Sequence, residues 1–142
     1  MLVDANRQRV AWGEVDLNDD IKIQEQKILD NLRGKFIESA RQKLTVIGAV
    51  LDVFRASPST EGLESVIMEI HTLKGLAGTF GYRDFSLIAA RLEVYLKGLS
   101  KPTQKHIDDV ELYIASLGAC IERDVHLDGA ELEQILTTLP TR

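Results

Sequence analysis

A histidine, a lysine and two glycines share one face of a predicted helix near the middle of the chain. His71, Lys74, Gly75 and Gly78 fall within about a third of the helix circumference, because successive residues are about 100° apart. A glycine inside a helix costs about 1 kcal/mol relative to alanine, so the pair indicates a surface where bare backbone is needed. The pattern predicts a nucleophilic histidine beside a cation, with room for another molecule to approach.

Such a site fits reversible phosphoryl transfer. An imidazole with its ordinary pKa near 6.5 is largely neutral and nucleophilic at cytoplasmic pH. Attack requires a lone pair on the outward ring nitrogen, and an acceptor for the hydrogen of the other nitrogen fixes that tautomer. Glu93, on the next predicted helix, is the candidate acceptor, and the Lys74 ammonium would offset charge on the phosphoryl oxygens.

This segment resembles the histidine-containing phosphotransfer (HPt) domain, including the first domain of chemotaxis-type histidine kinases. The positions that match the family pattern are His71, Lys74, Gly75, Ala77, Gly81, Leu92 and Glu93. The run Gly78-Thr79-Phe80-Gly81 is especially close to the chemotaxis-kinase version. The resemblance implies that Nε2 of His71 is the phosphoacceptor and that a glutamate at the position of Glu93 contacts the other ring nitrogen.

The resemblance also implies a covalent phosphoryl carrier rather than an enzyme. No glycine-rich P-loop or kinase nucleotide motif is present, so we expect no ATP-binding site and no cofactor. The expected partners are response-regulator receiver domains, which would supply Mg²⁺ and carboxylates, and a sensor histidine kinase. We expect them to dock on Ile67, Gly75 and Gly78, and we expect no metal site in this chain.

Long amphipathic segments surround the motif. Apolar residues recur at steps of three and four from Ile23, through inward positions that begin at Leu29 and Leu32, to a stop near Pro58. Gly34 is either a tolerated flaw in this helix or a break between two helices.

Four further helices follow from the same reasoning. Ser59 or Thr60 would cap the helix that carries His71, and Gly81 fits the left-handed position that closes it. Asp84 would cap the next helix. A fourth repeats apolar residues from 107 to 121, and Asp128 would open a short last helix.

Short turns between long helices predict antiparallel neighbours. The expected fold is therefore all-α, an up-down-up-down antiparallel four-helix bundle over residues 21–142 with a short additional terminal helix. Residues 1–20 lack apolar periodicity and are predicted to form a flexible N-terminal arm.

Composition narrows the class of protein. A formal net charge of −5 over 142 residues argues against broad nucleic-acid binding, which usually shows as a basic patch. No apolar run approaches the roughly 20 residues that span a bilayer, so membrane insertion is not expected. The single cysteine, Cys120, excludes an internal disulfide, suits a cytoplasmic location and is predicted to lie in the core.

Three alternatives remain open from the sequence. The chain could be the excised phosphoacceptor domain of a chemotaxis-type kinase, phosphorylated by an ATP-binding domain elsewhere. It could be a metal-binding helical bundle that uses His71 with Glu93, although no second histidine is spaced to complete a site. It could also be a structural adaptor with a degenerate site, against which the intact Lys74, Gly75 and Glu93 argue.

Overall fold

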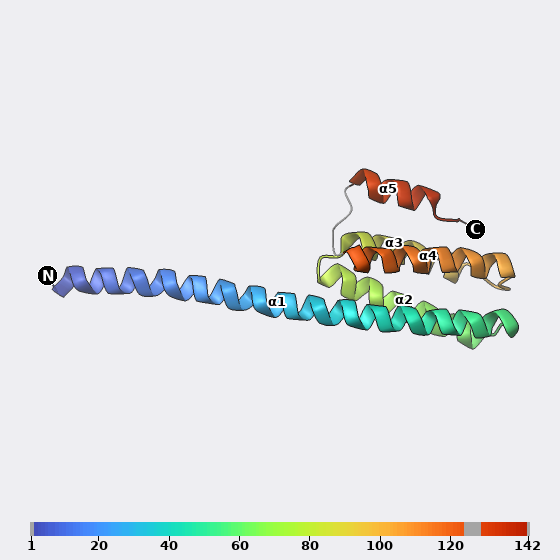
Figure 1. Cartoon of the computed structure of the whole chain (residues 1–142), viewed down its shortest axis with the longest axis horizontal. Coiled ribbons are helices and arrows are strands. Elements are labelled where there is room, and N and C mark those ends of the chain that lie inside the picture. Colours follow the sequence, from blue (N-terminus) through green and yellow to red (C-terminus); the bar gives the residue numbers. More distant parts are fainter. Residues whose placement is uncertain (1, 124–128, 142) are drawn as a thin grey trace. The chain divides into compact units, whose positions relative to one another are not determined.

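The computed structural model is all-helical over the part of the chain that it describes. It describes the backbone of residues 2–123 and 129–141, and the side chains in those ranges from Leu17 onward. These ranges contain five helices and no strand (Figure 1). The helices are α1 (Leu2–Ala56), α2 (Thr60–Thr79), α3 (Arg83–Lys97), α4 (Gln104–Arg123) and α5 (Gly129–Thr138).

The chain divides into two compact units, residues 1–35 and residues 36–142. Within the first unit, residues 2–35 are helical and belong to α1, which passes through Gly34 without a break. Gly34 is thus a tolerated helix position. The prediction that residues 1–20 form a flexible arm stays a prediction.

The buried stripe of α1 begins later than the periodicity predicts. Leu29 and Leu32 were expected to face inward, and both are exposed, whereas Phe36 is the first buried residue of the helix among those whose side chains are described, from Leu17 onward. That expectation was wrong because three-four spacing identifies one face of a helix without identifying what covers it.

The second unit is organised around one hydrophobic core to which α1, α2, α3 and α4 all contribute. The Phe36 ring lies against three aromatic rings near the α2–α3 turn, with centroid separations between 5.3 and 6.1 Å to Phe80, Tyr82 and Phe85. Cys120 is buried in this core, as predicted. Cys120 is thus one of the α4 residues that pack into the core.

The ends of α2 form as the sequence predicts. The Ser59 hydroxyl accepts a hydrogen bond from the Gly62 amide at 3.1 Å, which satisfies one of the free N–H groups of the first turn. Gly81 closes the helix with φ of +84°, a left-handed conformation that glycine adopts without the strain that a Cβ introduces. This closure sets the short connection to α3.

The start of α3 differs from the prediction. The cap is Tyr82, which makes no side-chain capping bond, and Asp84 lies inside the first turn. Buried Asp84 instead accepts a hydrogen bond from the Phe85 amide at 2.9 Å. Its carboxylate therefore serves a free N–H group of the first turn from within the helix rather than from the position before it.

Two bonds to main-chain carbonyls hold the C-terminal segment. The Arg91 guanidinium donates to the carbonyl of Leu136 on α5, and the Tyr113 hydroxyl donates to the carbonyl of Pro140 at 2.7 Å. Asp128, the predicted cap of this helix, lies outside the described residues. No described helix is both long and apolar enough to cross a membrane.

Candidate functional site

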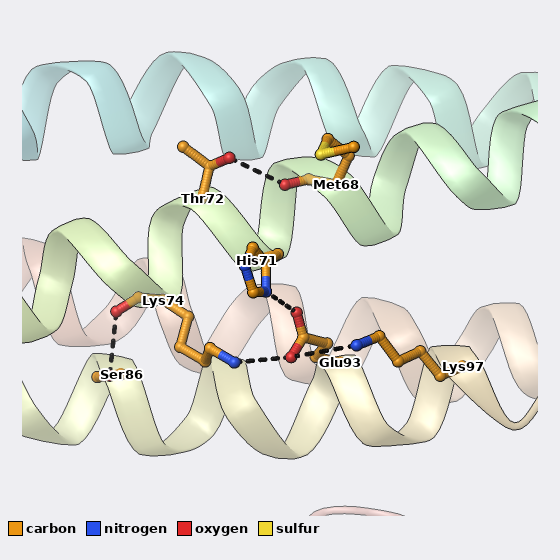
Figure 2. Close-up of polar contacts among 7 residues, drawn as sticks. All are labelled: Met68, His71, Thr72, Lys74, Ser86, Glu93 and Lys97. Atoms are coloured by element: carbon orange, nitrogen blue, oxygen red, sulfur yellow. Dashed lines mark hydrogen bonds and ion pairs between the residues drawn. The ribbon is translucent and has the colours of Figure 1, made fainter.

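His71 projects from α2 at the edge of the buried stripe. Its neighbours Ile70 and Leu73 are fully buried, whereas its own side chain is 61% exposed. The difference follows from the helical repeat, because one residue turns the side chain by about 100° away from the core. The imidazole thus reaches solvent while its backbone is fixed by the packing of α2 (Figure 2).

A buried carboxylate from α3 binds one nitrogen of this ring. Glu93 Oε2 lies 2.6 Å from His71 Nδ1, and the Glu93 side chain is only 7% exposed. An ionised carboxylate can only accept hydrogen bonds, so Nδ1 carries the hydrogen. In the neutral ring Nε2 then keeps its lone pair, as nucleophilic attack requires.

Lys74 binds the same carboxylate. Its Nζ donates to Glu93 Oε1 at 2.7 Å, so the two oxygens of Glu93 are divided between the imidazole and the ammonium (Figure 2). A third group, Lys97, lies one turn along α3 with its Nζ 3.7 Å from Glu93 Oε1. The site therefore joins α2 to α3 through one acid.

These neighbours keep Glu93 ionised. The hydrogen bond from Lys74 is the main cause that lowers the pKa of Glu93 below its ordinary value of 4.5. Burial acts in the opposite direction, and the His71 hydrogen bond and the charges of Lys74 and Lys97 add to the lowering. The buried group is thus a charged acceptor at neutral pH.

Ser86 fixes the spacing of the two helices beside the motif. Its hydroxyl on α3 donates to the main-chain carbonyl of Lys74 on α2 at 3.1 Å (Figure 2). The backbone from which the Lys74 side chain extends is therefore tied to the helix that carries Glu93.

Both glycines of the motif are exposed, and neither is required by tight helix packing. A Cβ added at Gly75 would meet no atom within 4 Å, and one added at Gly78 would meet only Ser86 Oγ, at an ordinary 3.6 Å. The fold of the isolated chain has room for side chains at both positions. Because they have no side chains, the two glycines leave the helix surface flat beside His71.

The predicted docking residue Ile67 is half-buried and packs against the core. The more exposed apolar side chain on this part of α2 is its neighbour Met68, at 65%. Sequence reasoning missed Met68, although its position three residues before His71 places it on the same face of the helix.

Sequence reasoning named Lys97 and Arg91 only as alternative partners of Glu93, and did not place Lys97 at the site itself. Its spacing of four residues from Glu93 was the available signal, since residues at i and i+4 of a helix lie side by side. The sequence offers Glu93 two cations on its own helix, Arg91 and Lys97, and only Lys97 has the spacing that brings it alongside. In the structure Arg91 instead bonds to α5.

A family model described as Hpt domain matches residues 31–139, which is most of the chain. The chain belongs to the Hpt domain family. No curated protein and no solved structure is similar enough to this chain to count as a match. Hpt domains carry phosphoryl groups on histidine in phosphorelays and interact with receiver domains and kinases.

The other described histidine and the single cysteine lie in separate surroundings in this Hpt domain. His106 Nδ1 accepts a hydrogen bond from the Thr103 amide at 3.0 Å, and its ring packs against Tyr95. His126 lies outside the described residues. Burial raises the pKa of the Cys120 thiol to about 12, which keeps it protonated and unreactive at neutral pH.

A metal site of protein side chains needs several close ligands. Within residues 17–123 and 129–141, no group of three or more His, Cys, Asp and Glu side chains is placed to hold an ion. His71 Nδ1 and Glu93 Oε2 are in direct hydrogen-bond contact, which leaves no space for a metal ion between these two atoms.

Proposed function

We propose that this Hpt domain is a phosphorelay intermediate that accepts a phosphoryl group on His71 Nε2 from one receiver-domain aspartate and passes it to another. The observation that carries the proposal is the 2.6 Å bond between His71 Nδ1 and buried Glu93, on a ring that is 61% exposed. It combines a fixed tautomer with an accessible nucleophile.

The transfer requires no cofactor in this chain. The Nε2 lone pair forms the new bond to phosphorus, while the bond between phosphorus and the donor aspartate breaks and its electrons leave with the carboxylate. The Nδ1 hydrogen stays on the ring, where Glu93 accepts it. In the reverse step the next receiver's aspartate attacks phosphorus and the electrons of the N–P bond return to Nε2. Phosphoryl transfer depends mainly on positioning and electrostatics, so Mg²⁺ and carboxylates on the receiver complete the site.

Lys74 acts on the charge that develops in this step. Its Nζ binds Glu93 Oε1 before transfer, and rotation about its side-chain bonds would bring it to the phosphoryl oxygens. A cation at this place stabilises the transition state and the phosphohistidine product.

The receiver docks on the face of α2 that surrounds His71. Gly75 and Gly78 keep this surface low, and Ile67 supplies the apolar contact at its centre. Met68 extends the apolar area next to Ile67. We further propose a cytoplasmic location and an up-down-up-down order for the four long helices, which sets α2 and α3 antiparallel with His71 facing Glu93.

A second candidate role is the phosphoacceptor domain of a chemotaxis-type kinase. The run Gly78-Thr79-Phe80-Gly81 favours it. In that role the phosphoryl donor is ATP bound to a separate kinase domain, and the chemistry at His71 is unchanged.

The two roles are separated by the donor that loads the protein. The full chain is mixed either with a radiolabelled phosphoreceiver or with a chemotaxis-type kinase core and ATP, and the labelled residue is located by mass spectrometry. Label on His71 from the receiver supports the relay role, and label only from the kinase core supports the kinase role. Absence of label on His71 from both donors contradicts the proposal.

A further inference from the structure

Glu93 has two lysine neighbours, and in the proposed reaction one of them moves away from it. Lys74 Nζ is 2.7 Å from Glu93 Oε1, while Lys97 Nζ is 3.7 Å from the same oxygen. Figure 2 shows the two ammonium groups approaching the carboxylate from opposite sides. If Lys74 turns to the phosphoryl group, the buried carboxylate loses its closest cation.

A buried charge without a partner is strongly unfavourable, because burial removes the water that would otherwise stabilise it. The Glu93 side chain is almost completely buried, so its position depends on the cations around it. A carboxylate that loses both lysines would take up a proton or rotate, and either change would disturb the acceptor of the His71 Nδ1 hydrogen.

Lys97 is placed to prevent this loss. Its Nζ is beyond ordinary hydrogen-bond distance from Oε1, and a movement of about 1 Å would bring it within range. Its side chain is 58% exposed and is therefore free to make this movement. The Glu93 carboxylate thus has one ammonium group in contact, that of Lys74, and a second nearby, that of Lys97, which can move into contact.

We propose that Lys97 is a positioning residue that takes over Glu93 Oε1 when Lys74 turns to the phosphoryl group. The inference rests on the proposed function of His71. It assigns Lys97 a role through Glu93, and it explains how Lys74 can leave a buried acid without disturbing the imidazole. Any cation in the last turn of α3 interacts favourably with the helix dipole and so stabilises the helix. The proposed role of Lys97 must therefore be distinguished from this general effect.

The test uses phosphoramidate, a small donor that loads histidine without a protein partner. Its P–N bond breaks, ammonia leaves and the Nε2–P bond forms. We expect Lys97→Met to reduce the loading rate of the full chain about five-fold, and Lys97→Arg to restore most of it. Lys105→Met is the control, since Lys105 also pairs with a buried acid four residues away, Asp109 on α4, and it should load at the wild-type rate.

A double-mutant cycle identifies the route of the effect. In a Glu93→Gln background there is no charge to balance, so Lys97→Met should cause no further loss. An equal loss in that background would mean that Lys97 contacts the phosphoryl group itself, and would overturn the inference. Side-chain NMR of the lysine ammonium groups should also show the Lys97 signal becoming protected from exchange on loading.

The outcomes separate the two proposals. A Lys97→Met protein that loads like wild type, or an unchanged Lys97 signal on loading, overturns the role of Lys97 and leaves the function of His71 standing. A wild-type protein that takes no phosphoryl group on His71 from phosphoramidate or from a phosphoreceiver overturns both.

Discussion

Lys74 Nζ and Glu93 Oε1 lie 2.7 Å apart, so the lysine of the motif is bound to the buried acid rather than extended over the imidazole. His71 binds the other oxygen of the same carboxylate. The three side chains therefore form one network across α2 and α3, and a change in any of them alters the surroundings of the other two.

Removal of the Lys74 ammonium should slow transfer without weakening docking. We expect Lys74→Ala to lower the maximal transfer rate about ten-fold, because the lost cation acts on charge that develops in the transition state. The receiver concentration that gives half the maximal rate should stay the same. Lys74→Arg, which keeps the charge, is the control. Wild-type rates in Lys74→Ala at saturating receiver would reduce Lys74 to a partner of Glu93 alone.

Replacement of His71 should remove phosphoryl acceptance and leave the fold intact. The side chain is mostly exposed, so His71→Gln creates no core cavity and should change the free energy of unfolding by less than about 1 kcal/mol. Acid-free gel analysis of the labelled protein measures acceptance, and circular dichroism follows the fold. Label that persists in the variant would point to a different acceptor.

The ionised state of Glu93 should appear in the pH dependence of stability. Its pKa in the folded chain lies below the ordinary value of 4.5, so the carboxylate contributes stability above that pH. The contribution is lost as the pH falls through the folded pKa. We expect the difference in unfolding free energy between wild type and Glu93→Gln to be constant from neutral pH to about 5 and to shrink in more acidic solution.

Urea unfolding at a series of pH values measures this difference. Asp109→Asn is a useful comparison, because Asp109 is also buried and bonded, to the Tyr95 hydroxyl at 2.7 Å, but lies on α4 and has no contact with the imidazole. Only Glu93→Gln should also reduce phosphoryl loading. Parallel stability curves for wild type and Glu93→Gln down to pH 3 would contradict the lowered pKa.

A larger side chain at position 75 should raise the stability of the chain while it blocks transfer from a receiver. No atom lies within 4 Å of a Cβ built there, so Gly75→Gln should stabilise the isolated chain by up to about 1 kcal/mol through its better helix propensity. The same side chain should block transfer from a receiver, while loading from phosphoramidate continues. Gly75→Ala gives the helix gain with little bulk and should keep most of the transfer. Normal exchange with receivers in Gly75→Gln would contradict the docking face.

The local features of the site follow from the helical repeat. Spacing alone puts His71, Lys74, Gly75 and Gly78 on one face and Ile70 in the core, and the structure agrees. Glu93 is different, because its contact with His71 spans two helices and no spacing within one segment encodes it. The family resemblance supplied that pairing.

The remaining differences between the sequence predictions and the structure also arise from contacts that residue spacing does not determine. Leu29 and Leu32 have the spacing of core residues, but burial depends on what packs against a helix face, which periodicity does not contain. Asp84 has the residue type of a cap, yet the cap is Tyr82, two residues earlier, and the carboxylate serves the first turn from inside. The Lys74–Glu93 bond depends on side-chain rotation, which residue spacing does not determine.

The attachment of α5 has a consequence for how this chain can change over generations. Arg91 and Tyr113 bind the carbonyls of Leu136 and Pro140, and every residue type offers a carbonyl. The donors are therefore constrained while the acceptors tolerate replacement. Substitutions at Tyr113 should therefore be rarer among functional descendants than substitutions at Pro140. Leu136 is a different case, because its side chain also packs against the hydrophobic core.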